Sequence, residues 1–274
     1  MAPSGPRSPS LLVRDVNQEC PPHRNLKHAA AIVACGYALL VVVMLAIGFT
    51  LTHLDSSVGR WDESVNRWFA NHRTDTWNSI TGVATWFVNT VPAIGLAVVI
   101  TAALALRARW REAAMLWIAL SLELLVFLSV TFVVARPRPN VVRLNSTPST
   151  SSFPSGHTAA ATVIFAGLAI IVLCCTARSL VRALALVFAV LAATTIGFAR
   201  VYRGLHHPTD VLAGALLGAG CLLVAVIAVR AVGLRKSGAE AEQSAPMLSE
   251  ALIALPIDPV EAARYEQDLR RNVG

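Results

Sequence analysis

Long apolar segments alternate with short polar ones along the chain between residues 29 and 232. A helix needs about 20 apolar residues to cross a bilayer, and six of the segments approach or exceed that length. They lie at about 29–52, 90–107, 112–135, 157–176, 181–199 and 209–232. The pattern therefore predicts an all-α, polytopic membrane protein with six transmembrane helices.

The stretch from Asp62 to Trp86 does not fit this pattern, because it mixes aromatic and charged residues. Tryptophan recurs through the region at positions 61, 68, 77 and 86, and tryptophan is enriched where a membrane meets water. We expect an amphipathic stretch at the membrane interface, followed by a short helix that leads into the second span. An ordinary soluble loop is the alternative interpretation.

The composition supports a membrane protein. Of the 274 residues, 55% are hydrophobic and 14% are charged, whereas a soluble domain has about 25% charged residues. The formal net charge of +7 is explained by cationic cytoplasmic segments and anionic lipids. No nucleic-acid-binding motif accompanies it, so we expect no nucleic acid partner. The five cysteines form no CxxC pair, which disfavours a disulfide framework or a metal site.

Six spans place both termini on the same side of the membrane. That side carries the excess of Lys and Arg, so the positive-inside rule places the termini in the cytoplasm. The chain then divides into a disordered cytoplasmic tail (1–28), a membrane domain (29–232) and a second cytoplasmic tail (233–274). The polar clusters described next all fall on the opposite, extracytoplasmic face of the cell membrane.

Pro154-Ser155-Gly156-His157 stands at the start of the fourth span. Ser155 is a favourable N-cap, and the backbone N–H groups of residues 155–157 would face outward as an anion site. Gly156 would let the anion approach the backbone closely, and His157 could give a proton to a leaving oxygen. A plain helix cap with an exposed histidine explains the same residues.

His206 and Asp210 stand four residues apart where the sixth span begins. Within a first helical turn, Asp210 can accept a hydrogen bond from His206, which fixes the tautomer of the imidazole. The other ring nitrogen of His206 is then free to act as a nucleophile. Asp210 as an N-cap is a compatible interpretation. A metal held by His206 and His207 is disfavoured, because helical metal pairs prefer i, i+4 spacing.

Arginines accompany these histidines. Arg136 and Arg138 end the third span, where Pro137 and Pro139 force an extended exit, and Arg200 ends the fifth span. Side chains two residues apart on an extended chain point the same way, and guanidinium groups suit bidentate binding of phosphate. Snorkelling to the interface is the alternative for the first pair; phosphate binding is favoured for Arg138 and left open for Arg136.

Together the clusters resemble the motifs of the type 2 phosphatidic acid phosphatase (PAP2) family of membrane lipid phosphatases. That family reads Lys-x6-Arg-Pro, then Pro-Ser-Gly-His, then Ser-Arg-x5-His-x3-Asp. The matching positions here are Arg138-Pro139, Pro154 to His157, and the set Arg200, His206 and Asp210. The resemblance implies a helical core like that of the PAP2 and haloperoxidase proteins.

The resemblance also implies a metal-independent phosphatase without a cofactor. His206 would attack the phosphorus to form a phosphohistidine, Asp210 would orient His206, and His157 would protonate the departing alcohol or phosphate. Water would then cleave the intermediate. The residues that would hold the phosphoryl oxygens are Arg138, Ser155, Gly156 and Arg200.

Two positions depart from the family pattern. Thr131 stands where the first motif has its lysine, and Ala199 stands where the third has its serine. Loss of one such phosphate-stabilising group costs on the order of 10²–10³ in rate. Either the enzyme is slow or a nearby arginine substitutes, and Arg203 is preferred to Arg136 and Arg143 because it lies inside the third motif.

The sequence thus predicts a membrane phosphatase that acts on a lipid phosphate or diphosphate at the outer leaflet. Its partners would be that substrate and the bilayer, and no feature indicates an oligomeric state. Polyprenyl diphosphate is the favoured substrate because the catalytic face is extracytoplasmic; phosphatidic acid and phosphatidylglycerophosphate are alternatives. Thr131 and Ala199 motivate a rival, a catalytically silent lipid-phosphate-binding relative. A transporter would show repeated halves with broken helices, and none is evident.

Overall fold

The computed structural model describes residues 22–54, 56–86, 90–145 and 150–253, and in these ranges the chain forms helices and no strand. The helices are α1 (Pro22–Phe49), α2 (Ser56–Asn71), α3 (Asp75–Trp86), α4 (Thr90–Ala105), α5 (Trp110–Val134), α6 (Gly156–Cys175), α7 (Ser179–Tyr202) and α8 (Pro208–Ile253), with a π-helical turn, η1 (Thr50–Leu54), after α1. The larger of two compact units, Leu26–Arg230, contains every motif residue. The predicted all-α fold is confirmed.

Five stretches of helix are long and apolar enough to cross a membrane: Leu26–His53, α5, α6, α7 and the first part of α8, Pro208–Val232. The sixth predicted span, at 90–107, forms α4 with 16 residues. At about 1.5 Å per residue, α4 covers roughly 24 Å, less than the roughly 30 Å of a bilayer core. Over the described ranges, the chain is a multi-pass membrane protein with five full-length spans and one shorter apolar helix.

The helices extend past the predicted boundaries of the membrane domain. α1 begins at Pro22, and proline is favoured at the first helical position, so residues 22–28, which the predicted boundary assigns to the first tail, are helical in the structure. α8 continues past position 232 to Ile253, so the predicted second tail begins as helix. Residues 1–21 and 254–274 of the two predicted tails lie outside the described ranges.

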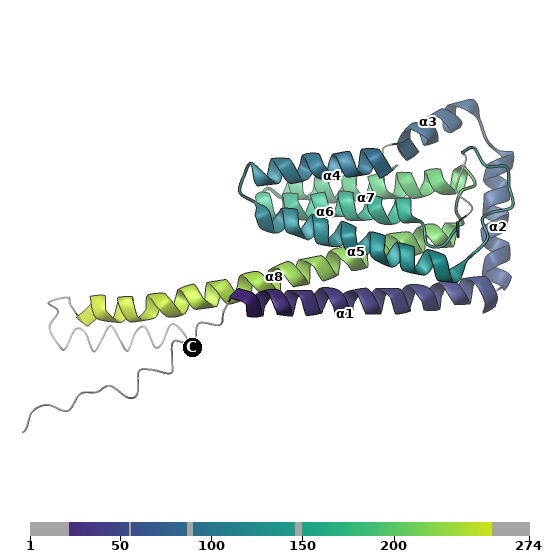
Figure 1. The fold of residues 1–274 in the computed structure, drawn as a ribbon. Coiled ribbons are helices and arrows are strands. Elements are labelled where there is room, and N and C mark those ends of the chain that lie inside the picture. Colours follow the sequence, from purple (N-terminus) through teal and green to yellow (C-terminus); the bar gives the residue numbers. More distant parts are fainter. Residues whose placement is uncertain (1–21, 55, 87–89, 146–149, 254–274) are drawn as a thin grey trace, which may run out of the picture. The chain divides into compact units, whose positions relative to one another are not determined.

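The long helices of the larger unit lie side by side, and α2 crosses one end of them (Figure 1). α6 packs against both α5 and α7, while α2 and α3 contact α7. One hydrophobic core joins α1, α5, α6 and α8, and its fully buried side chains include Met44, Leu116, Val126, Val163 and Leu217. This core holds together α5, α6 and α8, whose ends carry or adjoin the motif residues.

Two glycines let α8 approach α6 closely. A Cβ at Gly218 would lie 2.6 Å from the carbonyl oxygen of Ala159, and one at Gly214 would collide with the carbonyl oxygen of Ser155. The two glycines are four residues apart, the small-xxx-small spacing that brings membrane helices together. The Pro-Ser-Gly-His motif at the start of α6 is thereby held against the first turns of α8.

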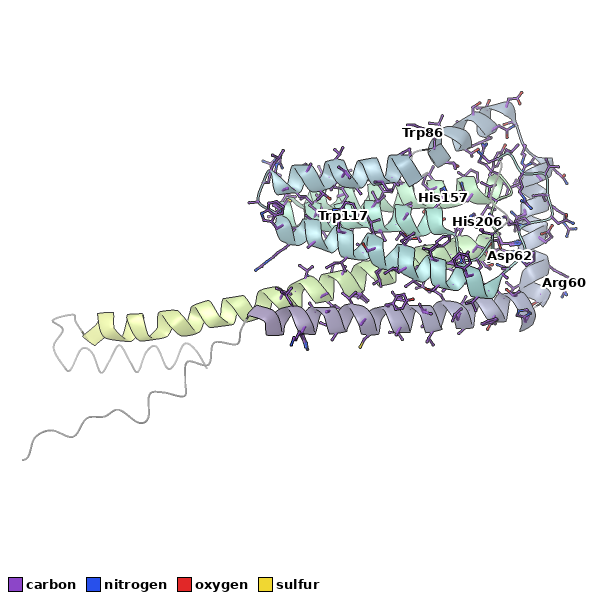
Figure 2. All side chains as sticks on the ribbon, viewed as in Figure 1. Arg60, Asp62, Trp86, Trp117, His157 and His206 are labelled. Atoms are coloured by element: carbon purple, nitrogen blue, oxygen red, sulfur yellow. The ribbon has the colours of Figure 1, made fainter. Side chains whose placement is uncertain are left out.

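α2 buries polar side chains and exposes aromatic ones. Among its described residues, the two that are fully buried are Asp62 and Asn66, while Trp61 and Trp68 are 52% and 56% exposed. At the end of α3, Trp86 is also exposed (Figure 2). The predicted pair, an amphipathic stretch and a short helix, is present as α2 and α3, so this region is not an ordinary loop.

Candidate active site

The predicted motif clusters meet at one end of the helices. His206 lies in the turn between α7 and α8, His157 lies in the first turn of α6, and both are at the same end (Figure 2). The chain after α5 is tied to the chain before α6 through Ser152. Its N–H donates to the carbonyl of Arg136 at 2.9 Å, and its hydroxyl donates to the carbonyl of Pro137 at 2.9 Å.

The end of α5 directs the chain that carries the first motif, Arg138-Pro139, toward the end of the helices where His157 and His206 lie. α5 ends at Val134, and Ala135 adopts the left-handed conformation (φ 48°, ψ 34°), after which the two prolines hold the chain extended. Thr131, at the position of the family lysine, is buried in the last turns of α5. Its hydroxyl donates to the carbonyl of Phe153 at 3.2 Å. Thr131 therefore fastens the loop that leads into the Pro-Ser-Gly-His motif.

Arg136 lies between two buried carboxylates. Its Nη2 is 2.8 Å from Asp62 Oδ2, and its Nη1 contacts Asp210 Oδ1 and donates to Thr209 Oγ1 at 2.8 Å. Arg136 is 5% exposed. Both proposed roles from the sequence, phosphate binding and snorkelling, are therefore wrong for Arg136, because its guanidinium is paired inside the protein.

Arg138 turns toward the His206 loop. Its Nη1 donates to the carbonyl of Leu205 at 2.7 Å, whereas its Nη2 makes only long contacts of 3.4 Å. Its Nε is buried and has no hydrogen-bond partner. Burial lowers the pKa of the Arg138 guanidinium, and the positive charge of Arg143 lowers it further. The Arg138 guanidinium thus makes one short hydrogen bond and keeps one buried N–H donor, at Nε, without a partner.

Arg200 is the second arginine with an unsatisfied donor. It lies in the last turn of α7, is 6% exposed, and its Nε is buried without a hydrogen-bond partner. A buried donor without a partner costs about 1–3 kcal/mol, more for a charged group. Arg138 and Arg200 therefore each lack an acceptor that a phosphoryl oxygen would supply.

His206 has one ring nitrogen committed and one available. Nδ1 lies 2.7 Å from the carbonyl oxygen of Ser152, and because a carbonyl only accepts, Nδ1 carries the hydrogen and Nε2 keeps its lone pair. Burial lowers the pKa of His206 well below its usual value, and the charges of Arg200 and Arg138 lower it further. His206 is thus a neutral imidazole beside two guanidinium groups.

Asp210 does not make the hydrogen bond to His206 that the sequence predicted. Its Oδ2 lies 4.0 Å from His206 Nδ1, because the carbonyl of Ser152 already occupies that nitrogen. Asp210 Oδ2 instead accepts the backbone N–H of His207 at 2.8 Å. With Pro208 as the first residue of α8, His207 is the N-cap and Asp210 the third helical residue, which is half of a capping box.

The second motif differs in part from the predicted anion site. The N–H of Ser155 donates to the carbonyl of Asp210 at 3.0 Å, so it is not available to an anion. The Ser155 hydroxyl shares a 2.9 Å hydrogen bond with Thr158. A Cβ at Gly156 would lie 3.0 Å from the ring of Phe127, so packing also explains this glycine. His157, half-buried, is one of the groups that lower the pKa of His206.

Arg203 is not placed to replace the family lysine. Its Nη1 donates to the carbonyl of Asn78 at 2.8 Å and to Thr81 Oγ1 at 3.1 Å. Its Nη2 donates to the carbonyl of Leu144 at 3.3 Å, and its Nε contacts Asn145 Oδ1. These contacts use the guanidinium to join α7 to α3 and to the loop after the first motif, which indicates a structural role; the phosphate role of Arg203 stays a prediction.

Three contributors were not predicted from the sequence. The carbonyl of Ser152 selects the tautomer of His206, and Asp62 holds Arg136. Asn66 donates to the carbonyl of His206 at 3.1 Å. A backbone carbonyl leaves no trace in residue types, but a carboxylate and an amide four residues apart in an amphipathic stretch are a visible signal, since they share one helical face.

Each of the two adjacent histidines has one ring nitrogen near a backbone carbonyl oxygen. His206 Nδ1 faces the carbonyl of Ser152, and His207 Nε2 lies 3.3 Å from the carbonyl of Pro137. Within the ranges that the structure describes, no group of three or more His, Cys, Asp or Glu side chains is arranged to hold a metal ion. The site is built from histidines and arginines.

Residues 112–233 match the PAP2 superfamily, which confirms the resemblance inferred from the motifs, all of which lie in this range. None of the curated proteins compared with the chain matches it. The crystal structure of the first transmembrane PAP2 type phosphatidylglycerolphosphate phosphatase from Bacillus subtilis is similar, with a TM-score of 0.61, 22% identity and coverage of 69% of this chain and 92% of that chain. The crystal structure of Aquifex aeolicus LpxE matches with a TM-score of 0.49 and 24% identity, and the match covers 61% of this chain and 93% of that chain. The Bacillus protein therefore shares the fold.

Proposed function

We propose that this protein is a membrane phosphatase that hydrolyses a lipid phosphate or diphosphate through a phosphohistidine on His206. The observation that carries the proposal is the state of His206. Its Nδ1 is committed to the carbonyl of Ser152, and Arg138 and Arg200 each have a buried Nε without an acceptor. A tetrahedral anion would complete this arrangement.

The reaction follows from these groups. His206 Nε2 attacks the phosphorus, so that a P–N bond forms while the P–O bond to the leaving group breaks. The guanidinium groups of Arg138 and Arg200 stabilise the negative charge on the phosphoryl oxygens, and His157 gives the leaving oxygen its proton. Water then attacks the phosphohistidine and gives a proton to His157, the P–N bond breaks, phosphate leaves, and His206 returns to its neutral form. No step requires a metal ion.

The substrate we propose is a polyprenyl diphosphate, with phosphatidic acid and phosphatidylglycerophosphate as the other candidates. The similarity in fold to a Bacillus subtilis phosphatidylglycerolphosphate phosphatase supports a lipid substrate. The predicted orientation, with the site extracytoplasmic and the termini cytoplasmic, favours the polyprenyl carrier.

The orientation is tested by thiol labelling in a cysteine-free variant. Asn140 lies just after the first motif and Ala177 lies between α6 and α7, and both are exposed. Cysteine in place of Asn140 should react with an impermeant reagent in intact cells, and cysteine in place of Ala177 should not. The reverse pattern would place the site in the cytoplasm and remove the argument for the carrier lipid.

The activity is tested by phosphate release from a panel of the three lipids by detergent-purified protein, with EDTA present. We expect release that orthovanadate blocks, and none from the His206→Ala variant. Loss of activity in EDTA that magnesium restores would contradict the metal-independent mechanism. A folded wild-type protein that binds the lipids and releases no phosphate would be the catalytically silent relative.

A further inference from the structure

We propose that Asp62 of α2 is a positioning residue for the reaction at His206 and that it acts through Arg136. The inference rests on the proposed function and adds a residue outside the three motifs. Asp62 and Asn66 are both fully buried and lie one helical turn apart, on the same face of α2. Burying a carboxylate and an amide is unfavourable unless their hydrogen bonds are made; the Asp62 carboxylate and the Asn66 Nδ2 make theirs, while Asn66 Oδ1 is buried without a partner.

The carboxylate of Asp62 joins three elements of the fold. Its Oδ1 accepts the backbone N–H of Thr209 at 3.1 Å, and its Oδ2 accepts the Thr209 hydroxyl at 2.5 Å. The same Oδ2 is 2.8 Å from Arg136 Nη2. α2 is thereby attached both to the first turn of α8 and to the extended chain after α5.

These contacts lead to the peptide group that joins His206 to His207. Arg136 also contacts Asp210, and Asp210 accepts the N–H of His207 at 2.8 Å. From the same face of α2, Asn66 donates to the carbonyl of His206 at 3.1 Å. The backbone of the two histidines is therefore held from α2 by two routes, and Asp62 and His206 lie at the same end of the larger unit (Figure 2).

If the contacts of Asp62 with Arg136 and Thr209 served only stability, apolar side chains would serve as well, because buried ion pairs are often replaced by hydrophobic residues at no cost in stability. Hydrogen bonds instead fix the orientation of the groups that they join, since each has a preferred distance and angle. A misplacement of about 1 Å at a reacting group can cost about 100-fold in rate. We therefore expect Asp62 to affect kcat and to leave KM nearly unchanged.

The test compares Asp62→Asn with Glu63→Gln in the full-length protein in detergent. Asparagine keeps the shape but turns an N–H₂ group toward Arg136 and the Thr209 hydroxyl, both of which are donors. Asp62→Asn should lower kcat about 10- to 100-fold with KM within about threefold, and Asp62→Glu should recover part of the loss. Glu63→Gln removes the neighbouring carboxylate, which accepts a long 3.4 Å contact from the backbone N–H of Asn140, and should behave as wild type.

A double-mutant cycle with Arg136 distinguishes a positioning role of Asp62 from a contribution to stability alone. If Asp62 acts through Arg136, Asp62→Asn should cost little more in the Arg136→Gln background than Arg136→Gln costs alone, whereas independent effects would multiply. If Asp62→Asn lowers the melting temperature, Thr209→Val takes its place, because it removes the shared hydroxyl and keeps the backbone contact. Wild-type kcat in either folded variant, or multiplying effects, would overturn the inference.

Binding of orthovanadate distinguishes this inference from the proposed function. If the wild type hydrolyses no lipid but binds orthovanadate, the proposed function fails, and the vanadate Kd decides about Asp62. A Kd weakened about tenfold or more by Asp62→Asn and not by Glu63→Gln supports positioning, and an unchanged Kd overturns it. A wild type that neither hydrolyses nor binds overturns both.

Discussion

Arg136 and Arg200 are buried to the same degree, 5% and 6% exposed, yet their surroundings are opposite. Arg136 lies between Asp62 and Asp210 with its charge paired. Arg200 has a buried Nε without an acceptor. The comparison teaches that burial alone does not identify a ligand-binding arginine. The partners of each nitrogen are the better indicator, because a buried donor that lacks a hydrogen-bond partner requires an explanation.

The largest effect is expected at the histidine beside the unsatisfied arginines. His206→Ala removes the nucleophile and should lower kcat by at least about 10³-fold, as losses of catalytic nucleophiles do in other hydrolases. His207→Gln, at the neighbouring histidine, should cost far less. Phosphate release by His206→Ala within tenfold of wild type would assign the nucleophile elsewhere.

The two arginines should respond in opposite ways when each is changed to glutamine. Arg200→Gln should lower kcat/KM by about 10²–10³-fold without lowering the melting temperature, because its Nε is buried without a hydrogen-bond partner. Arg136→Gln should destabilise the fold by about 3–5 kcal/mol, because two buried carboxylates lose their cation. Phosphate release and thermal unfolding in detergent, measured on both variants, check this; the same loss of stability in both would end the distinction.

The neutral state of His206 should make the fold sensitive to acid. Burial lowers the pKa of His206 below its ordinary value of 6.5, so below pH 6.5 the unfolded chain takes up a proton that the folded chain refuses. Stability is then lost as pH falls from 6.5 toward the folded pKa, by up to about 1.4 kcal/mol per pH unit. Unfolding measured at pH 7.5 and 5.5 should show that the free energy of unfolding decreases less on acidification in His206→Asn than in wild type. An equal decrease in the two proteins would mean that His206 is charged in the folded state.

The smallest kinetic effect is expected at Arg203. The sequence alone suggests that Arg203→Ala lowers kcat/KM at least tenfold, about 1.4 kcal/mol, and that Thr131→Lys recovers part of it. The contacts of Arg203 with α3 and the loop at 144–145 instead predict a lower melting temperature with kcat/KM within about threefold. A tenfold kinetic loss at wild-type stability would return Arg203 to the phosphate site.

Hydropathy predicted most of the fold, while the roles of the candidate site residues stay predictions. The apolar segments at 112–135, 157–176 and 181–199 correspond to α5, α6 and α7, because a membrane span must be apolar along its whole length. The length of the predicted span at 90–107 was overestimated, because α4 ends at Ala105. Apolar residues near the end of a helix do not reveal where the helix stops. His206 and Arg200 could be proposed from the sequence because they lie close together along the chain, around the turn between α7 and α8.

The partners of these residues could not be predicted, because they are set by long-range packing. Asp62 meets Arg136 across 74 positions and Asn66 meets the carbonyl of His206 across 140. The carbonyl of Ser152 belongs to the backbone, which every residue has. The expected contact between His206 and Asp210 failed for the same reason, since a distant carbonyl competes for the same nitrogen.

The central claim is that the phosphoryl group is carried on Nε2 of His206, and trapping the intermediate tests it most directly. Wild-type protein quenched during turnover of ³²P-labelled lipid should hold an acid-labile, alkali-stable label. Peptide mapping should place the label on residue 206, and ³¹P NMR should assign it to Nε2. A label on another residue, or full turnover with no labelled protein at any quench time, would contradict the account.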